Sequence, residues 1–285
     1  MKPTLFFLPL SIAVVVLPVS AQRISTNNAD NAPPITVRGI PDAPPNPKAT
    51  LNPRVPGSFQ IESSNAYSRA DIFVRCVGPD AKALWPIVEG PPNETTTATM
   101  QGLFVMHNRA CRIAGSELGL ANPTDLGRYS NAGTPNSDSQ VSGSPTAFYD
   151  RGALIEYAIK KYAADVRVTK ADTHSEPVVN RFIAVEQGRN RFRWPEDLAY
   201  FKIAACMVQA QPELSSDLIA SKPGSVNASR IGFTIIARAH LCVPRARHIE
   251  VDPTQFRVYI ADAYYRWAEA TKGVDALVPA RDEAS

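Results

Sequence analysis

Residues 227–242 read NASRIGFTIIARAHLC and end in a cysteine, and residues 93–111, NETTTATMQGLFVMHNRAC, follow the same plan earlier in the chain. When the two stretches are aligned on Cys111 and Cys242 without a gap, apolar residues coincide at helical spacing. The coinciding pairs are Met100 with Ile231, Phe104 with Ile235, and Val105 with Ile236. The sequence therefore predicts two helices of one design, each leading to a cysteine.

A second pair of helices, farther along each half, matches in the same way. Their apolar residues share the spacing i, i+1, i+4, i+5 and i+8. They are Leu154, Ile155, Ala158, Ile159 and Tyr162 in the first half, and Tyr259, Ile260, Ala263, Tyr264 and Trp267 in the second. Asp252 is a typical N-cap, Pro253 suits the first helical turn, and Gly273 is a typical stop. We therefore expect the final helix to lie between Pro253 and Gly273.

Helix breakers also fall in matching places: GPD and PPN in the first half, QPE and KPGSVN in the second. Coincident apolar stripes arise by chance between helical segments, but cysteines, breakers and closing helices in one order favour an internal duplication. We therefore expect a mainly α fold of two tandem homologous units, at 59–163 and 195–273. Each unit should have three to four helices and an internal disulfide, and an extended or β-like linker should join the two.

The four cysteines are Cys76, Cys111, Cys206 and Cys242. An even number in an exported chain favours disulfides, and neither a CxxC pair nor a cysteine–histidine finger spacing suggests a metal. Of the three possible connectivities, the nearly equal spacings select Cys76 with Cys111 and Cys206 with Cys242. No metal site is predicted.

Export itself is inferred from residues 1–21. Lys2 precedes an apolar run of about 15 residues, too short for a spanning helix of about 20, and small residues follow the run at once. A retained membrane anchor is the alternative. We expect a signal peptide cleaved after Ala21, no later transmembrane segment, and a periplasmic or secreted product.

Four segments are expected to lie outside the helical units. Residues 22–58 are rich in proline and should form a disordered arm. A polar insertion at 116–146 is either a functional loop or a long connection without a function. The linker at 164–194 contains the short β-like runs VRV and RFIAVE and ends in GRNRFRW, whose alternation predicts a half-buried strand or an extended segment with solvated arginines. Residues 274–285 should form a disordered tail.

No nucleophile elbow, zinc-protease motif or phosphate loop is found in the sequence, and no cofactor is predicted. The carboxylates in apolar settings are Glu117, in AGSELGL, and Glu156, in ALIEYAI. Either could protonate a leaving oxygen, as the acid of a glycan hydrolase does. A lone glutamate on a helix is ordinarily a surface charge.

Basic and aromatic residues provide the candidate binding positions, which are His107, Arg109, Arg238, His240, Tyr265 and Arg266. The first four lie just before Cys111 and Cys242 and could bind an anion. Basic side chains also gather in the last turn of helices for electrostatic reasons alone. Tyr265 and Arg266 fall off the apolar stripe of the final helix and could meet a partner, although core packing is the simpler interpretation of the aromatic cluster there.

Asn93 and Asn227 each begin a glycosylation acceptor pattern, NET and NAS. Both also precede an apolar helix, and we favour a helix-capping role for them. The net charge of +3 points to no strongly charged partner. The leading hypothesis is an exported, non-enzymatic binding or protein-interaction module of the cell envelope or secreted space. Its expected partner is an envelope protein or polymer rather than a nucleic acid; the alternative is a hydrolase of envelope polymers with a helix-borne glutamate acid.

Overall fold

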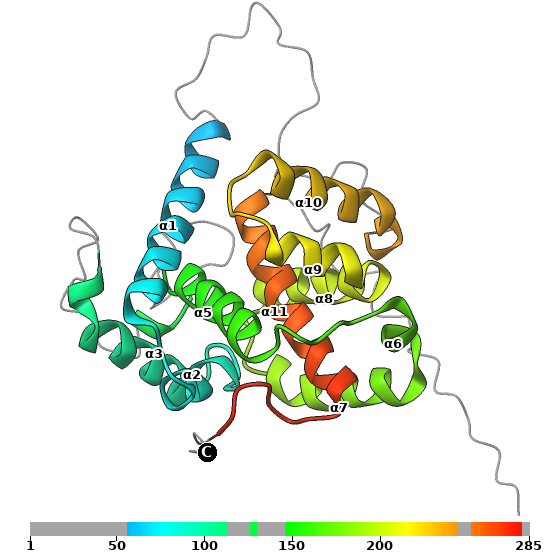
Figure 1. The fold of residues 1–285 in the computed structure, drawn as a ribbon, viewed down its shortest axis with the longest axis horizontal. Coiled ribbons are helices and arrows are strands. Elements are labelled where there is room, and N and C mark those ends of the chain that lie inside the picture. The colour runs from blue at the N-terminus through cyan, green and yellow to red at the C-terminus, as the bar shows by residue number, and fades with distance from the viewer. Residues whose placement is uncertain (1–55, 113–125, 130–145, 244–251, 281–285) are drawn as a thin grey trace, which may run out of the picture. The chain divides into compact units, whose positions relative to one another are not determined.

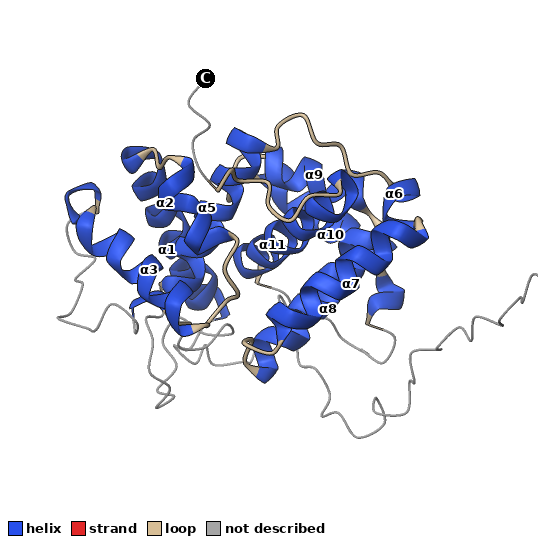
Figure 2. Cartoon of the chain, turned by 90° about the horizontal axis from the view of Figure 1, so that it is seen from below, coloured by secondary structure: helices blue, strands red, loops and turns tan. Residues whose placement is uncertain are grey.

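The computed structural model describes residues 56–112, 126–129, 146–243 and 252–280. Within these ranges the chain forms helices and no strand, and the predicted mainly α fold is confirmed (Figure 2). The first helices are α1 (Pro56–Val77), α2 (Ala81–Val88), α3 (Thr95–His107), the 3-10 turn η2 (Arg109–Cys111) and α5 (Ala147–Tyr162). They are followed by α6 (Lys170–His174), α7 (Glu176–Asn190), α8 (Pro195–Ala210), α9 (Pro212–Ala220), α10 (Val226–Arg238), the 3-10 turn η3 (His240–Cys242) and α11 (Pro253–Lys272).

Two long helices, α5 and α11, pack against each other at the centre of the described helices (Figure 1). On one side α1 and α2 pack on α5, and on the other α7, α8 and α9 pack on α11. Most α5 and α11 residues are buried, including Leu154 and Ile260, which are 0 % exposed. Burial of an apolar side chain of this size contributes about 1.5 to 3 kcal/mol, so these two helices hold much of the core.

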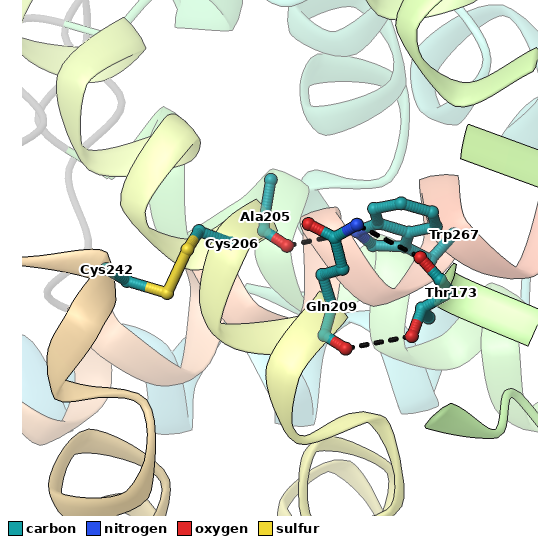
Figure 3. The surroundings of a disulfide bond; sticks show 6 residues. All are labelled: Thr173, Ala205, Cys206, Gln209, Cys242 and Trp267. Carbon is teal, nitrogen blue, oxygen red and sulfur yellow. Dashed lines mark hydrogen bonds between the residues drawn. A yellow bond between two sulfur atoms is a disulfide. The ribbon is translucent and has the colours of Figure 1, made fainter. Parts of the chain in front are cut away.

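Both predicted disulfides are confirmed, Cys76 with Cys111 and Cys206 with Cys242. Each joins a long helix to the short 3-10 turn that follows α3 or α10. Figure 3 shows the second disulfide beside other anchors of α8. The Trp267 indole N–H donates to the carbonyl oxygen of Ala205 at 3.0 Å, and Gln209 exchanges hydrogen bonds with Thr173. The disulfide and these hydrogen bonds fix α8 to η3, α11 and α6.

The elements between the paired cysteines recur at a constant interval. α2 and α9 begin at Ala81 and Pro212, and α3 and α10 begin at Thr95 and Val226, in both cases 131 residues apart. The turns η2 and η3 keep the same interval. The buried residues of the two short helices also correspond one by one; they are Ala81, Leu84, Ile87 and Val88 in α2 and Pro212, Ser215, Leu218 and Ile219 in α9.

Two buried arginines, Arg151 on α5 and Arg257 on α11, close the ends of these short helices in the same way. Arg151 donates to the carbonyl oxygens of Ile87, Val88 and Gly90, and Arg257 donates to those of Leu218, Ile219 and Ser221. The last carbonyls of a helix have no partner within it, and a guanidinium satisfies several at once. The two arginines are 106 residues apart. The apolar pattern of the sequence aligned the closing helices with an offset of 105 residues, and this offset is therefore one residue too short.

The linker prediction for 164–194 is wrong, because α6 and α7 occupy most of it. Thr169 and Asp172 form a capping box at the start of α6, and Pro177 stands in the first turn of α7. Phe182 stacks on Trp267 with ring centroids 4.1 Å apart. The run RFIAVE, which suggested a strand, thus belongs to α7, which packs on α11, whereas VRV lies between α5 and α6.

The stretch GRNRFRW also differs from its prediction, because two of its arginines are buried ion-pair partners. Arg193 lies 2.6 Å from a carboxylate oxygen of Asp262 and 3.3 Å from one of Asp197. Arg189 lies 2.9 Å from Glu269. Alternating charge was read as exposure, but pairing with carboxylates on distant helices allows guanidinium groups to be buried.

The predicted boundaries of the disordered ends need two corrections. α1 begins at Pro56, three residues inside the expected arm; the rest of the arm and the signal peptide lie outside the described residues. In the predicted tail, Val278 is 0 % exposed and its backbone N–H donates to Glu89 and to the Tyr265 hydroxyl. Residues 274–280 are therefore part of the packed structure.

Helix capping follows the prediction at one end of the chain and departs from it elsewhere. Asp252 accepts hydrogen bonds from the first-turn N–H groups of α11, and Gly273 ends that helix at φ 70°. Asn93 and Asn227 are not N-caps. Glu94 and Ser225 cap α3 and α10 instead, and Asn93 accepts a hydrogen bond from the backbone of Tyr129 at 3.0 Å.

Candidate functional site

A cleft of about 540 Å³ opens between α1 and the α9–α10 region. α1 forms one wall, and the α9–α10 connection with α10 forms the other. The first turn of α11 closes one end, between Pro253 and Arg257. In Figure 1, α1 and α10 stand on either side of that end of α11. The volume falls in the range of small-molecule and peptide side-chain sites.

The floor of the cleft is apolar. It includes the side chains of Tyr67, Leu218, Ile236 and Phe256. Phe233 stands at the cleft with 54 % of its surface exposed. An exposed phenylalanine beside an apolar floor gives a ligand apolar area to cover, which is the main favourable contribution in such sites.

Lysines and arginines outnumber carboxylates around this floor. Lys160, Lys222 and Arg75 are exposed and line the cleft. Asp71 is the only carboxylate residue among the described lining residues, and it forms a 2.8 Å ion pair with Arg75. The two lysines therefore leave the cleft with a positive potential that favours an anionic group.

Two glycines shape the cleft wall. Gly224 has φ 70°, the left-handed region that favours glycine, and it lets the chain turn from α9 into α10, where Ser225 caps the new helix. Gly232 lies inside α10, and a methyl group there would meet the Phe256 ring at 3.6 Å, an ordinary contact. A methyl group at Gly232 would thus fit against the ring, and a larger side chain there would cover Phe256.

Glu156, one of the two carboxylates considered as an acid, lies beneath the cleft and is buried. Arg257 binds both of its oxygens, at 2.6 and 2.9 Å, and Lys160 lies 3.2 Å from one of them. Burial raises the pKa of the neighbouring Tyr67 hydroxyl well above its usual value, and the charge of Glu156 adds to the increase. With both oxygens held by cations, Glu156 is placed as an ion-pair partner of Arg257. Glu117 lies outside the described residues.

The other predicted binding residues do not line the cleft. His107 and Arg238 end α3 and α10, while Arg109 and His240 lie in the turns η2 and η3. All four are exposed. Their positions agree with the preference of basic side chains for helix C-termini, which was the alternative to an anion site.

Tyr265 and Arg266 do not meet solvent, which was the alternative to core packing, because both are buried in a network of charges. Arg266 lies 3.2 Å from Glu89 and 3.1 Å from Glu269, and it donates to the carbonyl oxygen of Val88. The Tyr265 hydroxyl donates to Glu89. A helical wheel correctly places these residues off the apolar stripe of α11. The face on which they lie is nevertheless covered by α7 and the end of α2, which provide carboxylates to pair with Arg266.

Two neighbouring carboxyl groups of this network, Glu89 and Glu269, shift each other's pKa in opposite directions. Burial, with the hydrogen bond and charge of Glu89 acting in the same direction, raises the pKa of Glu269 to about 7 despite the nearby charge of Arg266. Burial also acts to raise the pKa of Glu89. Hydrogen bonds from Glu269 and Tyr265 and the charges of Arg266 and Arg189 outweigh it and lower the pKa of Glu89. The pair therefore holds one proton near neutral pH.

We predict from this pair that the folded protein loses stability as the pH rises from about 5 to about 8. In this range the folded chain keeps the Glu269 proton that the unfolded chain has already released, so raising the pH favours unfolding by about 2 kcal/mol. Urea unfolding at a series of pH values measures the slope. Glu269→Gln keeps a donor beside Glu89 and should flatten the slope; an equally steep slope in this variant would contradict the assignment.

The cleft residues were not among the sequence-based candidates. The signals that could have indicated them are the KPG turn before α10 and the glycine inside its apolar stripe, which was read only as a helix pattern. Among the described residues, no group of three metal-ligating side chains lies together, and no helix is long and apolar enough to cross a bilayer.

No protein family model matches the chain, and neither a curated protein nor a solved structure is similar to it at a significant level. The functional argument therefore depends on the residues themselves.

Proposed function

We propose that the protein is an exported, non-enzymatic binding module of the cell envelope or secreted space, and that the cleft between α1 and α10 is its binding site. Its ligand has an apolar group for the floor and a negative charge for Lys160 and Lys222. The observation that carries the proposal is the combination of an open apolar floor and more cationic than anionic side chains around a cleft of about 540 Å³. Among envelope components, acidic proteins and polymers provide that chemistry.

Export is supported by the signal-like sequence at residues 1–21 and by the two disulfides, which persist in oxidising compartments. We propose cleavage after Ala21 and a periplasmic or secreted location. N-terminal sequencing of the mature protein, recovered from outside the cytoplasm, would test this.

We also propose that α1–α5 and α8–α11 are two copies of one ancestral unit. The support comes from the constant interval of 131 residues, the matching buried positions of α2 and α9, and the two arginines that close the short helices at equivalent carbonyls. A chance resemblance between helical segments would not reproduce a buried guanidinium with the same three acceptors. In this arrangement the cleft combines α1 of the first copy with α9–α11 of the second.

The binding proposal is tested with the dye anilinonaphthalene sulfonate, which combines an aromatic body with a negative charge. We expect fluorescence enhancement on addition of the native protein, because the dye should enter the cleft. Gly232→Trp should remove the enhancement by covering Phe256. Lys222→Glu should weaken binding about tenfold, which corresponds to about 1.4 kcal/mol.

The matched control is Ala237→Trp, which adds the same bulk to an exposed position of α10 that does not line the cleft. It should bind the dye as the native chain does. Circular dichroism on each variant would verify that α10 remains folded. Equal enhancement in Gly232→Trp and the native chain would place the dye elsewhere and contradict the proposal.

A further inference from the structure

The first half of the chain contains a counterpart of the cleft, and a short segment occupies it. Four cleft-lining positions, Gly224, Ser229, Thr254 and Arg257, have equivalents in the first half at the intervals set by the helices and the two arginines. These equivalents are Asn93, Ala98, Phe148 and Arg151. Asn93 and Gly224 also share a left-handed backbone, with φ 62° and 70°. Residues 126–129 lie against the equivalent positions.

The occupying segment contacts its site through backbone and aromatic groups. Gly127 lies so close to Ala98 that a methyl group on Gly127 would be 1.6 Å from the Ala98 carbonyl oxygen. The backbone N–H of Tyr129 donates to the Asn93 side chain at 3.0 Å. The Tyr129 ring meets Phe148 edge to face, with centroids 5.3 Å apart, and is 3 % exposed. This site thus accepts a glycine, whose backbone approaches α3 closely, and a tyrosine whose ring is buried.

The segment at 126–129 belongs to the polar insertion that the second half lacks at the corresponding place. In the second half, the position equivalent to that of residues 126–129 is the open cleft described above. The proposed duplication therefore gives two equivalent sites. Residues 126–129 occupy the site in the first half, and no described residue occupies the site in the second half.

The two sites differ in charge. Arg128 in the occupying segment donates to the Thr95 hydroxyl at 3.0 Å. The equivalent of Thr95 in the second half is Val226, which offers no acceptor side chain, and Lys160 and Lys222 line the open cleft. An occupant of the cleft should thus replace the basic residue by an acidic one.

We propose that the cleft binds a short polypeptide segment of a partner protein, with an aromatic residue next to an acidic residue, in the manner in which residues 126–129 occupy the equivalent site. The aromatic ring packs on the cleft near Thr254 and Arg257, the equivalents of Phe148 and Arg151, and the acidic group pairs with Lys160 or Lys222. This inference rests on the proposed binding function and narrows its ligand from any apolar anion to a peptide.

The test uses a hexapeptide with the sequence of residues 125–130, DLGRYS, carrying Arg128→Glu. We expect it to displace anilinonaphthalene sulfonate from the native chain at concentrations up to about 1 mM, because a segment with few contacts binds weakly. The same peptide with Tyr129→Ala should bind at least about tenfold more weakly. The unmodified peptide, with arginine, should also bind more weakly than the glutamate form.

Location is tested with a photo-reactive benzophenone amino acid in place of the peptide's tyrosine. Mass mapping should place the cross-links on α10 or the first turn of α11, and Gly232→Trp should abolish them while Ala237→Trp retains them. If the dye binds in the cleft but no peptide displaces it, the peptide inference is wrong and the binding proposal stands. If the dye itself does not bind there, the binding proposal fails. Cross-links that persist in Gly232→Trp would also overturn the inference.

Discussion

Replacing Arg266 with leucine is expected to lower the free energy of unfolding by about 3 to 5 kcal/mol, the range for removing one partner of a buried ion pair. The guanidinium is 2 % exposed and contacts Glu89 and Glu269, and it also satisfies the carbonyl oxygen of Val88. Leucine fills part of the volume but leaves these carboxylates without their main cation. Equilibrium unfolding in guanidinium chloride, which screens surface charges, measures the loss.

The matched control is Arg75→Leu. Arg75 also pairs with a carboxylate, Asp71, but 65 % of its side chain is exposed. A surface pair one helical turn apart contributes about 0.3 to 0.5 kcal/mol, so the control should be close to the native chain. A similar small loss for both variants would show that the buried network contributes no more than a surface pair. Circular dichroism should show native helicity for both before denaturant is added.

The helices of the two halves could be predicted from the sequence because local signals define them. Breakers such as Gly78 and Gly224 adopt left-handed backbone, and Asp252 and Gly273 delimit α11 as expected. The equal cysteine spacings also suffice for the pairing. α7 was missed because its valines and isoleucine were read by β-propensity, whereas its packing on α11 decides the outcome.

Buried charge explains most of the errors in the predicted site. Periodicity arguments treat apolar residues as the inward ones, so Arg193 and Arg266 were placed at the surface. Each has at least one partner far away in sequence: Asp262 is 69 positions from Arg193, and Glu89 is 177 positions from Arg266. A single sequence gives no signal for such a pair.

The residues that line the cleft could not be predicted for a different reason. The cleft arises where a side chain is missing, at Gly232, and where the insertion containing Tyr129 has no counterpart. Amino-acid patterns indicate which residues pack together, but an unfilled space depends on the three-dimensional arrangement of α1, α10 and α11. The proposed duplication makes the space interpretable, because residues 126–129 would then fill the equivalent position in the first half.

Removal of one disulfide is expected to cost about 4 kcal/mol in either half. The two bridges close loops of almost the same length, with sequence separations of 35 and 36. In the loop-entropy description the stabilisation depends on that length alone, so Cys76→Ala with Cys111→Ala should destabilise the chain as much as Cys206→Ala with Cys242→Ala. Urea unfolding of the two double variants measures both losses.

Removal of both disulfides should then cost about 8 kcal/mol, which is comparable with the whole stability of an ordinary domain. We therefore expect the fourfold alanine variant to be largely unfolded at 25 °C, while each double variant stays folded in buffer. The comparison separates two explanations. Equal losses agree with a constraint on the unfolded chain, which is the same in both halves. Unequal losses would mean that one bridge also acts through the folded state.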